Sequence, residues 1–512
     1  MNTFHRYGLY PTVFITGAAI LVVEILATRL LAPYYGTTIF STSSIITVIL
    51  AALSIGYWIG GRYSDKHCHL DHFAWFIAAG GVGVLVIAVL NSLFVPVIGY
   101  QLSLTSGPLL LSLFLFFGPI LLLGMLSPYA IALQNAFSPE VGIGTISGRI
   151  FFWSTLGSIA GSLLTAYLLI PSFTIPQILL ATGVVLTALG VGIRLIAGTH
   201  YQATLPMVFF AVALFYGEGV SPFLSPAIYQ SQGVYSQITV FDAPYDGEET
   251  RFLVQDRQSS GALNKASGKS AFEYAKYYDI YRLFNRDIKN ALIIGGGAYI
   301  IPKMLHENKP SVSIDVAEIE PNLEALSKEY FQLPDTPQIK THVKDGRRLL
   351  LDSNQQYDYI FSDAFSSLYG QPTQLVSKAF FDLAKKRLND NGIFIANIIG
   401  YFPPEGGPSL AGSAYLTMKS VFPEHLLIAV ESNEIHKIQN FIFVGMNGKM
   451  PNVDYHFLRR HPDPLFSELG EKVILTEKLR LENELIFTDS YAPVESLSAQ
   501  ALTYGVTAKK IS

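Results

Sequence analysis

The stretch Asn290-Ala-Leu-Ile-Ile-Gly-Gly-Gly297 joins a short apolar run, typical of a buried strand, to three consecutive glycines. A helix-like stretch follows to about Asn308, and a second apolar run over 312–317 ends in Glu318. This order of strand, glycine turn, helix, strand and acid predicts a nucleotide-binding βαβ unit. Glycines let the backbone approach a ligand closely, and the Glu318 carboxylate can accept both ribose hydroxyls. The spacing alone fits both a dinucleotide fold and an S-adenosyl-type fold.

Two further acids follow the next predicted strands. Val343-Lys-Asp345-Gly346 closes a third strand, and Tyr357-Asp-Tyr-Ile-Phe-Ser-Asp363 reads as a fourth strand that ends in Asp363. Ligands of open α/β sheets bind where the strands end at their carboxyl side. We therefore expect Glu318, Asp345 and Asp363 to gather around one adenosine-shaped cavity at that edge. Further elements predicted are a helix over 378–388, a turn over 389–392 and a strand over 393–398.

Charge density divides the 512-residue chain into two unlike halves. Residues 1–218 hold only 11 of the chain's 35 basic and 39 acidic residues, whereas the whole chain is 50% apolar. This contrast predicts a transmembrane bundle over 1–218, a linker with a small antiparallel β subdomain over 219–287, and a nucleoside-binding Rossmann-like domain over 288–512. Disorder and coiled coil are excluded by this composition. A net charge of −4 indicates no nucleic-acid partner, and the single cysteine excludes an intrachain disulfide.

Six apolar runs are long enough to cross about 30 Å of hydrocarbon. They cover 11–33, 40–60, 73–98, 107–133, 150–170 and 175–197. A shorter seventh run over 203–217 is also predicted to cross. The placement of Lys and Arg in alternate loops puts the N-terminus in the cytoplasm. The C-terminal half is then cytoplasmic with six crossings and outside with seven; the supply of a nucleoside metabolite favours the cytoplasm.

Polar residues inside the first span are unusual enough to need an explanation. Glu24 and Arg29 are each costly near the middle of a bilayer, so we expect both to face the interior of the bundle. Gly157 and Gly161 form a GxxxG pair that predicts close helix packing. The loop over 67–72 contains three histidines and a cysteine, but its spacing fits no standard metal motif, and we expect no bound metal.

Several motifs together resemble the aminopropyltransferases, the spermidine and spermine synthases, over roughly residues 233–500. They are Gly295-Gly296-Gly297, Ala317-Glu-Ile-Glu-Pro321, Asp345-Gly346-Arg-Arg348, the strand that ends in Asp363, Asn391-Gly-Ile-Phe394 and Gln258-Ser259. The stretch Thr488-Asp-Ser-Tyr-Ala-Pro-Val-Glu495 and the motifs Glu24-Ile-Leu-Ala-Thr-Arg29 and Gly60-Gly-Arg62 resemble the membrane-fused members. The resemblance implies a multi-pass protein of the cell membrane, with at least a dimer as its assembly.

The resemblance also implies roles for particular residues. Glu318 would hold the ribose, Asp345 the adenine, and Asp363 would take the catalytic place. Gln258 would line the substrate side, where Tyr277 and Tyr278 could add hydroxyls or cation–π contacts. The implied reaction transfers an aminopropyl group from decarboxylated S-adenosylmethionine to an amine such as putrescine, without a metal.

Three positions depart from the family pattern on the amine side. Ala298-Tyr299 stands where the family has Asp-Gly, Ser366 provides no second acid after Asp363, and Ser236 occupies the place of a glutamine. Burying a diamine without anionic partners costs several kcal/mol per ion. Two alternatives therefore stay open: an S-adenosylmethionine-dependent methyltransferase with another acceptor, and a transporter or sensor that binds a nucleoside or polyamine without turnover. S-adenosylmethionine itself would need a cation or amide donor for its carboxylate.

Overall fold

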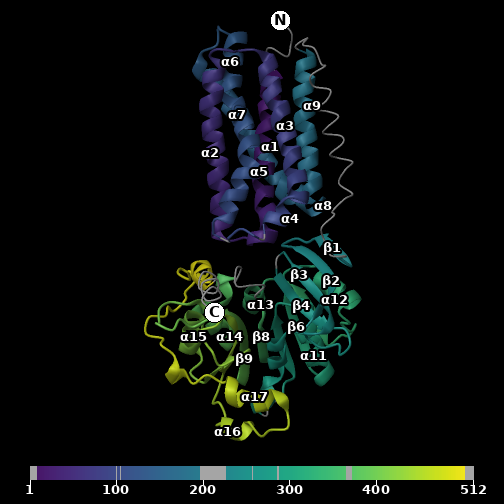
Figure 1. The fold of residues 1–512 in the computed structure, drawn as a ribbon, viewed down its shortest axis with the longest axis vertical. Coiled ribbons are helices and arrows are strands. Elements are labelled where there is room, and N and C mark those ends of the chain that lie inside the picture. Colours follow the sequence, from purple (N-terminus) through teal and green to yellow (C-terminus); the bar gives the residue numbers. More distant parts are fainter. Residues whose placement is uncertain are drawn as a thin grey trace. The chain divides into compact units, whose positions relative to one another are not determined.

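The structure is a computed structural model that describes residues 8–99, 101–103, 105–196, 227–256, 258–284, 287–364 and 372–501. The chain divides into two compact units, Met1–Ser225 and Pro226–Ser512. The first is a bundle of helices and the second an α/β unit with two sheets (Figure 1). The predicted fold class is confirmed. The apolar run over 203–217, predicted to be a seventh crossing, lies outside the described residues.

The described part of the first unit has six helical spans that are long and apolar enough to cross a membrane. They are α1 (Leu9–Tyr35), α2 (Ile39–Ser64), α3 (Leu70–Leu93), α5 with α6 (Gly107–Gly124, Leu126–Phe137), α7 with a π turn and α8 (Ile143–Leu164, Thr165–Leu169, Ile170–Ser172), and α9 (Ile175–Ile196). A short helix, α4 (Val95–Ile98), follows α3. The π turn ends two residues before Pro171, which has no N–H for the regular hydrogen-bond ladder. All six predicted spans are therefore present as helices.

Glycines set how closely these helices pack. A Cβ on Gly157 would lie 2.0 Å from the Phe14 carbonyl oxygen, and one on Gly161 would lie 2.4 Å from that of Ala18. The predicted GxxxG packing is thus confirmed, with α1 as the partner of α7. Glu24 and Arg29 are half-buried on α1, and their role stays a prediction.

A small antiparallel sheet opens the second unit, as expected. Its strands lie in the order β1 (Tyr229–Gln232), β2 (Gln237–Tyr245), β3 (Glu248–Gln255) and β4 (Gln258–Asn264). The β2–β3 turn consists of Asp246 at φ 51° and Gly247 at φ 79°, the left-handed pair that a two-residue hairpin favours. Pro244 and Tyr245 precede this turn and are the last residues of β2.

The large sheet has the strand order β10-β11-β9-β8-β5-β6-β7. The strands are β5 (Asn290–Ile294), β6 (Ser313–Glu318), β7 (Ile339–Val343), β8 (Tyr357–Ser362), β9 (Leu388–Gly400), β10 (His425–Ala429) and β11 (Gln439–Met446). The five strands from β7 to β9 are parallel, and β11 is antiparallel to β9. The chain moves outward from β5 through β6 to β7 and then returns to β8 on the other side. This switch point, between β5 and β8, is where such sheets bind ligands.

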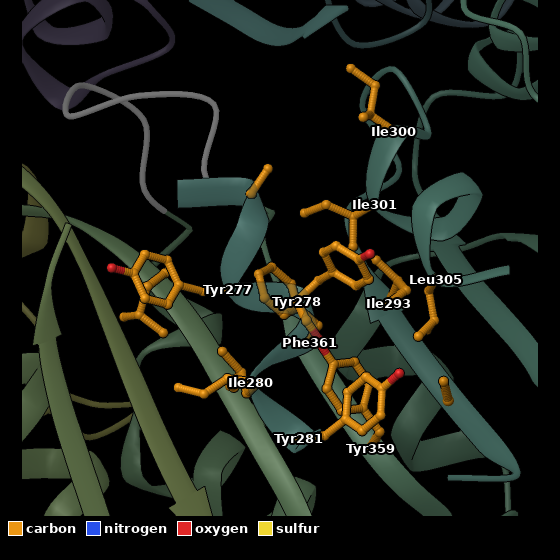
Figure 2. Packing of buried hydrophobic residues seen from close by; sticks show 14 of the residues in the cluster. Tyr277, Tyr278, Ile280, Tyr281, Ile293, Ile300, Ile301, Leu305, Tyr359 and Phe361 are labelled. Atoms are coloured by element: carbon orange, nitrogen blue, oxygen red, sulfur yellow. The ribbon is translucent and has the colours of Figure 1, made fainter. Parts of the chain in front are cut away.

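Helices cover both faces of the large sheet. One core contains side chains of α11 (Ile300–Asn308), α12 (Leu323–Tyr330), α17 (Pro464–Lys472) and the 3₁₀ helix η5 (Glu273–Phe284), together with the small sheet. The other contains side chains of α13 (Gly346–Asp352), α14 (Lys378–Lys386) and α15 (Leu410–Val421). Figure 2 shows the first core, where Tyr281 of η5 meets Tyr359 of β8, which in turn stacks with Phe361 of the same strand. The η5 helix is therefore packed on the face of β8 that carries Tyr359 and Phe361.

Candidate active site

The glycine turn between β5 and α11 lies against two other segments. Gly295 and Gly297 have φ of 94° and 51°, in the region that favours glycine. A Cβ on Gly295 would lie 2.5 Å from the Asp363 carbonyl oxygen, and one on Gly297 would lie 2.3 Å from that of Ser260 in β4. The turn thus fits only because these positions lack side chains, and it brings the end of β8 and the start of β4 together.

Glu318, at the end of β6, holds the glycine turn. Its Oε2 accepts hydrogen bonds from the backbone N–H groups of Gly296 (2.8 Å) and Gly297 (3.3 Å), and its Oε1 accepts one from that of Glu320 (2.8 Å). Burial raises the pKa of Glu318, and these backbone donors oppose that rise. Backbone donors therefore already bind both oxygens of this carboxylate. The role of Glu318 in ribose binding stays a prediction.

Asp345 lies beside Glu318 at the end of the neighbouring strand. The Lys344 N–H donates to the Glu318 carbonyl oxygen at 3.0 Å, which joins the ends of β6 and β7. Asp345 is the N-cap of α13, and its Oδ1 accepts from the Arg348 N–H at 3.0 Å. A Cβ on Gly346 would lie 2.3 Å from Ile294, so α13 starts directly against the end of β5.

Asp363 follows β8, and the period of the strand determines the direction of its side chain. Tyr359 and Phe361 belong to the core beneath η5, so Asp363, two residues further, faces the same side. Its Oδ1 accepts from Asn397 Nδ2 at 2.9 Å, and the Tyr274 hydroxyl of η5 donates to the same carboxyl group. Burial raises the pKa of Asp363 to about 7, against the lowering effect of these two hydrogen bonds.

All three acids therefore lie around the end of β5. The Asp363 backbone contacts Gly295, the Glu318 carboxylate binds the next two amides, and Asp345 begins the helix that rests on Ile294.

The predicted substrate-side residues lie in different places. Gln258 begins β4, two residues before the carbonyl group that touches Gly297, so it is near the glycine turn. The Tyr278 hydroxyl instead contacts Asn308, the last residue of α11. Since α11 runs from the carboxyl edge to the opposite edge of the sheet, the structure places this hydroxyl away from the three acids.

Tyr277 does not contact the acids among the interactions that the structure shows. Its hydroxyl is buried, with Glu273 and Glu468 as the nearby charges, and it has no hydrogen-bond partner among the described residues. Tyr277 and Tyr278 therefore do not take the expected position on η5, and Tyr274 takes it instead. The reason is that η5 is pinned by the Tyr359 hydroxyl, which donates to the Tyr278 carbonyl oxygen at 2.8 Å.

Sequence reasoning also missed Asn397 and Tyr274, although signals for both exist. Asn397 is the one amide in the apolar run 393–398 and shares a face with the core residues Ile393 and Ile395. A polar residue on the buried face of a strand needs a partner. Tyr274 precedes Tyr277 by three residues, the repeat of a 3₁₀ helix, but a 3₁₀ helix of 12 residues is not predictable from local pattern.

The departures from the family pattern have a structural counterpart. Ala298 is 3% exposed, and a Cβ on Gly261 of β4 would lie 2.4 Å from its methyl group. The place of the expected acid is therefore filled by a small apolar contact between the glycine turn and β4. Ser236 accepts a hydrogen bond from Gln255 Nε2 at 3.2 Å, and Ser366 lies outside the described residues.

Within the described ranges, no three His, Cys, Asp or Glu side chains are grouped so as to hold a metal ion, and the loop over 67–72 is included in that statement.

The segment that forms this edge of the sheet is similar to a known protein family. Residues 280–398, which carry the glycine turn and all three acids, match the model of the spermine/spermidine synthase domain. The chain contains a spermine/spermidine synthase domain. This synthase domain makes it a transferase other than a methyltransferase.

Relatives of the synthase domain include proteins of known name. The chain is 26% identical over 301 residues to a polyamine aminopropyltransferase of Vibrio vulnificus, covering 54% of this chain and 94% of that protein. It is 32% identical over 109 residues to a "probable polyamine aminopropyl transferase" of Bifidobacterium longum, covering 21% of this chain and 24% of that protein. A solved structure of a probable spermidine synthase from Corynebacterium glutamicum aligns with a TM-score of 0.43 at 19% identity, over 52% of this chain and 99% of that one.

Proposed function

We propose that the second unit transfers an aminopropyl group from decarboxylated S-adenosylmethionine to an amine such as putrescine, and that the helices of the first unit anchor it in a membrane. The observation that carries the proposal is the placement of Asp363: a half-buried carboxyl group at the switch point, held by Tyr274 and Asn397, whose pKa is raised to about 7.

The chemistry of the transfer needs such a group. A new N–C bond forms at the carbon next to the sulfonium, the C–S bond breaks, and methylthioadenosine leaves with the electron pair. The attacking amine must be neutral, although free alkylamines have a pKa near 10, like that of lysine. Asp363 in its ionised form can accept the amine proton, and a base with a pKa near the working pH is the most effective one. Tyr274 and Asn397 would keep the acceptor oxygen directed at the amine.

The adenosyl group of the donor would occupy the glycine-turn edge, with Glu318 at the ribose and Asp345 at the adenine.

The six apolar helices support membrane anchoring, and the placement of Lys and Arg favours a cytoplasmic N-terminus. With six crossings the synthase domain would be cytoplasmic as well, which the supply of a nucleoside metabolite also favours. A reporter that is active only in the cytoplasm, fused after Ser512, should be active. The same reporter fused in the loop after α1 should be silent. The opposite result after Ser512 would place the domain outside.

The activity can be tested with purified full-length protein in detergent. Incubation with decarboxylated S-adenosylmethionine and putrescine, cadaverine or spermidine should release methylthioadenosine. The Asp363→Asn variant should have a kcat at least 100-fold lower but should still bind methylthioadenosine. Asp358→Asn on the same strand, whose carboxylate caps backbone and Asn389 donors away from this edge, is the matched control. Binding without transfer to any of the three amines would contradict the proposal.

The apolar contact at Ala298 favours one second candidate, a sensor or transporter domain that binds a nucleoside or polyamine without turnover. In that case methylthioadenosine would bind, and Asp363→Asn would change no rate because there is none.

A further inference from the structure

We infer that Asn440 is a positioning residue, which holds the amide of Asn397 in the orientation that donates to Asp363. The inference rests on the proposed function only in treating Asp363 as the proton acceptor.

The geometry begins with the direction of β11. Because β11 is antiparallel to β9, its first residues lie at the edge where β8 and β9 end, and Asn440 pairs with Ile399. Ile442 and Val444 belong to the core beneath η5, so Asn440 faces that side as well. Asp363, Asn397 and Asn440 thus form a row across the ends of three neighbouring strands, on one face.

Two hydrogen bonds of equal length connect the row. Asn440 Nδ2 donates to Asn397 Oδ1 at 2.9 Å, and Asn397 Nδ2 donates to Asp363 Oδ1 at 2.9 Å. An asparagine amide has a donor end and an acceptor end of nearly the same shape. The donor from Asn440 fixes the acceptor end of Asn397 on its own side and thereby turns the donor end toward Asp363.

The burial of Asn397 makes the loss of one of its hydrogen-bond partners costly. Asn397 is 2% exposed, so water cannot readily replace a missing partner. Without Asn440, a turned amide would present its carbonyl oxygen to Asp363, and only a protonated carboxyl group could satisfy that oxygen. Loss of Asn440 should therefore favour the protonated form of Asp363.

Few other groups can produce the same effect. Among the residues that the structure describes, the titratable groups that face Asp363 are Tyr274 from η5 and Tyr359 from β8 itself. Both keep their protons at neutral pH because burial raises the pKa of each hydroxyl well above 10. Among the described residues, Lys and Arg do not contribute to the shift of Asp363. The state of the Asn397 amide is thus the main variable in contact with the carboxyl group.

The test titrates Asp363 directly in full-length protein, by the infrared carboxyl band that is lost in Asp363→Asn. Valine is suited to a strand, so the first variant is Asn440→Val. In this variant we expect the midpoint of the pH titration of that band to rise by about one pH unit. Asn440→Thr, whose hydroxyl is one bond too short to reach Asn397, should shift it in the same direction and serves if the valine variant does not fold.

Asn447→Val is the matched control. Asn447 lies just past the other end of β11 and donates to the carbonyl oxygens of Leu388 and Asn389 at 3.2 Å, so its loss should lower stability without moving the midpoint. An unchanged midpoint in both folded Asn440 variants would overturn the inference. A shifted midpoint in protein that transfers nothing would leave the inference standing and contradict only the proposed function.

Discussion

At Asp363, burial and hydrogen bonding act on one carboxyl group in opposite directions. Removal from water favours the neutral form, while the donors of Asn397 and Tyr274 favour the charged form. The balance places the pKa at about 7, where small changes in either contribution alter the ionised fraction. The ionisation of Asp363 therefore depends on two neighbouring side chains as well as on its burial.

The same balance predicts a pH-dependent cost in stability. Because the pKa of Asp363 is higher in the folded state than the ordinary value of 3.8, the folded state binds more protons between about pH 4 and pH 7. Its contribution to the free energy of unfolding is therefore full below pH 4 and declines as the pH rises to about 7. Asp363→Asn should become progressively more stable relative to the natural chain over that range, measured as the difference in thermal midpoint of the second unit. A difference that is constant with pH would contradict this.

The candidate site was predictable where a strand end shows in the sequence and not where tertiary packing decides. Glu318 and Asp363 follow recognisable strands, and the structure places them at one edge. Tyr274 was not predictable, because its position depends on how η5 is pinned across β8 by Tyr359. Asn440 was missed because β11 was not identified as a strand.

At the scale of elements, Glu320 joins the two sheets of the second unit. It is 1% exposed, and its carboxylate accepts from the backbone N–H groups of Val234 (2.9 Å) and Tyr235 (2.8 Å), just before β2. Its own N–H donates to Glu318. The small sheet is thus connected to the glycine turn through two successive carboxylates.

Glu320→Gln should loosen this connection. The amide replaces one acceptor oxygen by a donor that faces a backbone N–H, which costs about 1–3 kcal/mol for a buried group. We expect faster hydrogen exchange at Val234 and Tyr235 and a lower thermal midpoint. The exposed Glu329→Gln is the control and should change neither. Unchanged exchange at Val234 would show that another contact holds this segment.

A second junction links the C-terminal segment to α13 and α14. Asp489 accepts from both Nη atoms of Arg347 (2.8 and 2.6 Å) and from Ser377 Oγ (2.6 Å), and Ser377 is the N-cap of α14. The Arg347 guanidinium and the Ser377 hydroxyl lower the pKa of Asp489 to about 2. This stabilisation is present above about pH 4 and is lost as the pH falls toward 2.

Asp489→Asn should therefore destabilise the second unit by about 1 kcal/mol at neutral pH, a modest figure because Asp489 is half exposed. Urea unfolding at pH 7 and pH 3 measures it, and the difference from the natural chain should shrink at the lower pH. Asp382→Asn, which breaks an exposed pair with Lys378 on α14, should cost at most about 0.5 kcal/mol.

Elements with strong local signals were correctly predicted, and those without were not. The strand β5 matches its predicted residues, and α14 ends two residues before the predicted end. The turn predicted over 389–392 falls within the bounds of β9, but its residues do not pair with β8: the pairing passes from Leu388 directly to Ile393. Asn391 has a φ of 62°, in the left-handed region, as expected for a turn.

At the scale of the whole molecule, the two units differ in how their own elements pack. In the first, helices approach through glycines, as at Gly157 and Gly161 against α1. In the second, apolar side chains fill two cores on either face of a sheet. The low charge density of residues 1–218 predicted this division, and the packing partners of the helices were not predictable because each apolar face looks alike in sequence.

Gly157→Leu should separate the stabilities of the two units. Its side chain would meet the Phe14 carbonyl oxygen, at a cost of about 1–3 kcal/mol or more. Gly148→Leu on the same helix, where a Cβ would meet nothing within 4 Å, is the control. All three tryptophans, Trp58, Trp75 and Trp153, lie in the first unit, so tryptophan fluorescence during heating in detergent reports on that unit alone. Methylthioadenosine binding should persist in both variants, and equal midpoints would contradict the packing role.

The antiparallel direction of β11 has a practical consequence for the design of shortened versions of this protein. The segment that matches the synthase domain ends at residue 398 and starts at 280, yet Tyr274 precedes it and Asn440 comes after it. A fragment cut to those limits would retain Asp363 and Asn397 but lose the hydrogen-bond donors Tyr274 and Asn440. It would also lose β4, whose Ser260 carbonyl group lies against Gly297. We expect such a fragment to have no transfer activity, and that result would not test the activity of the full-length protein.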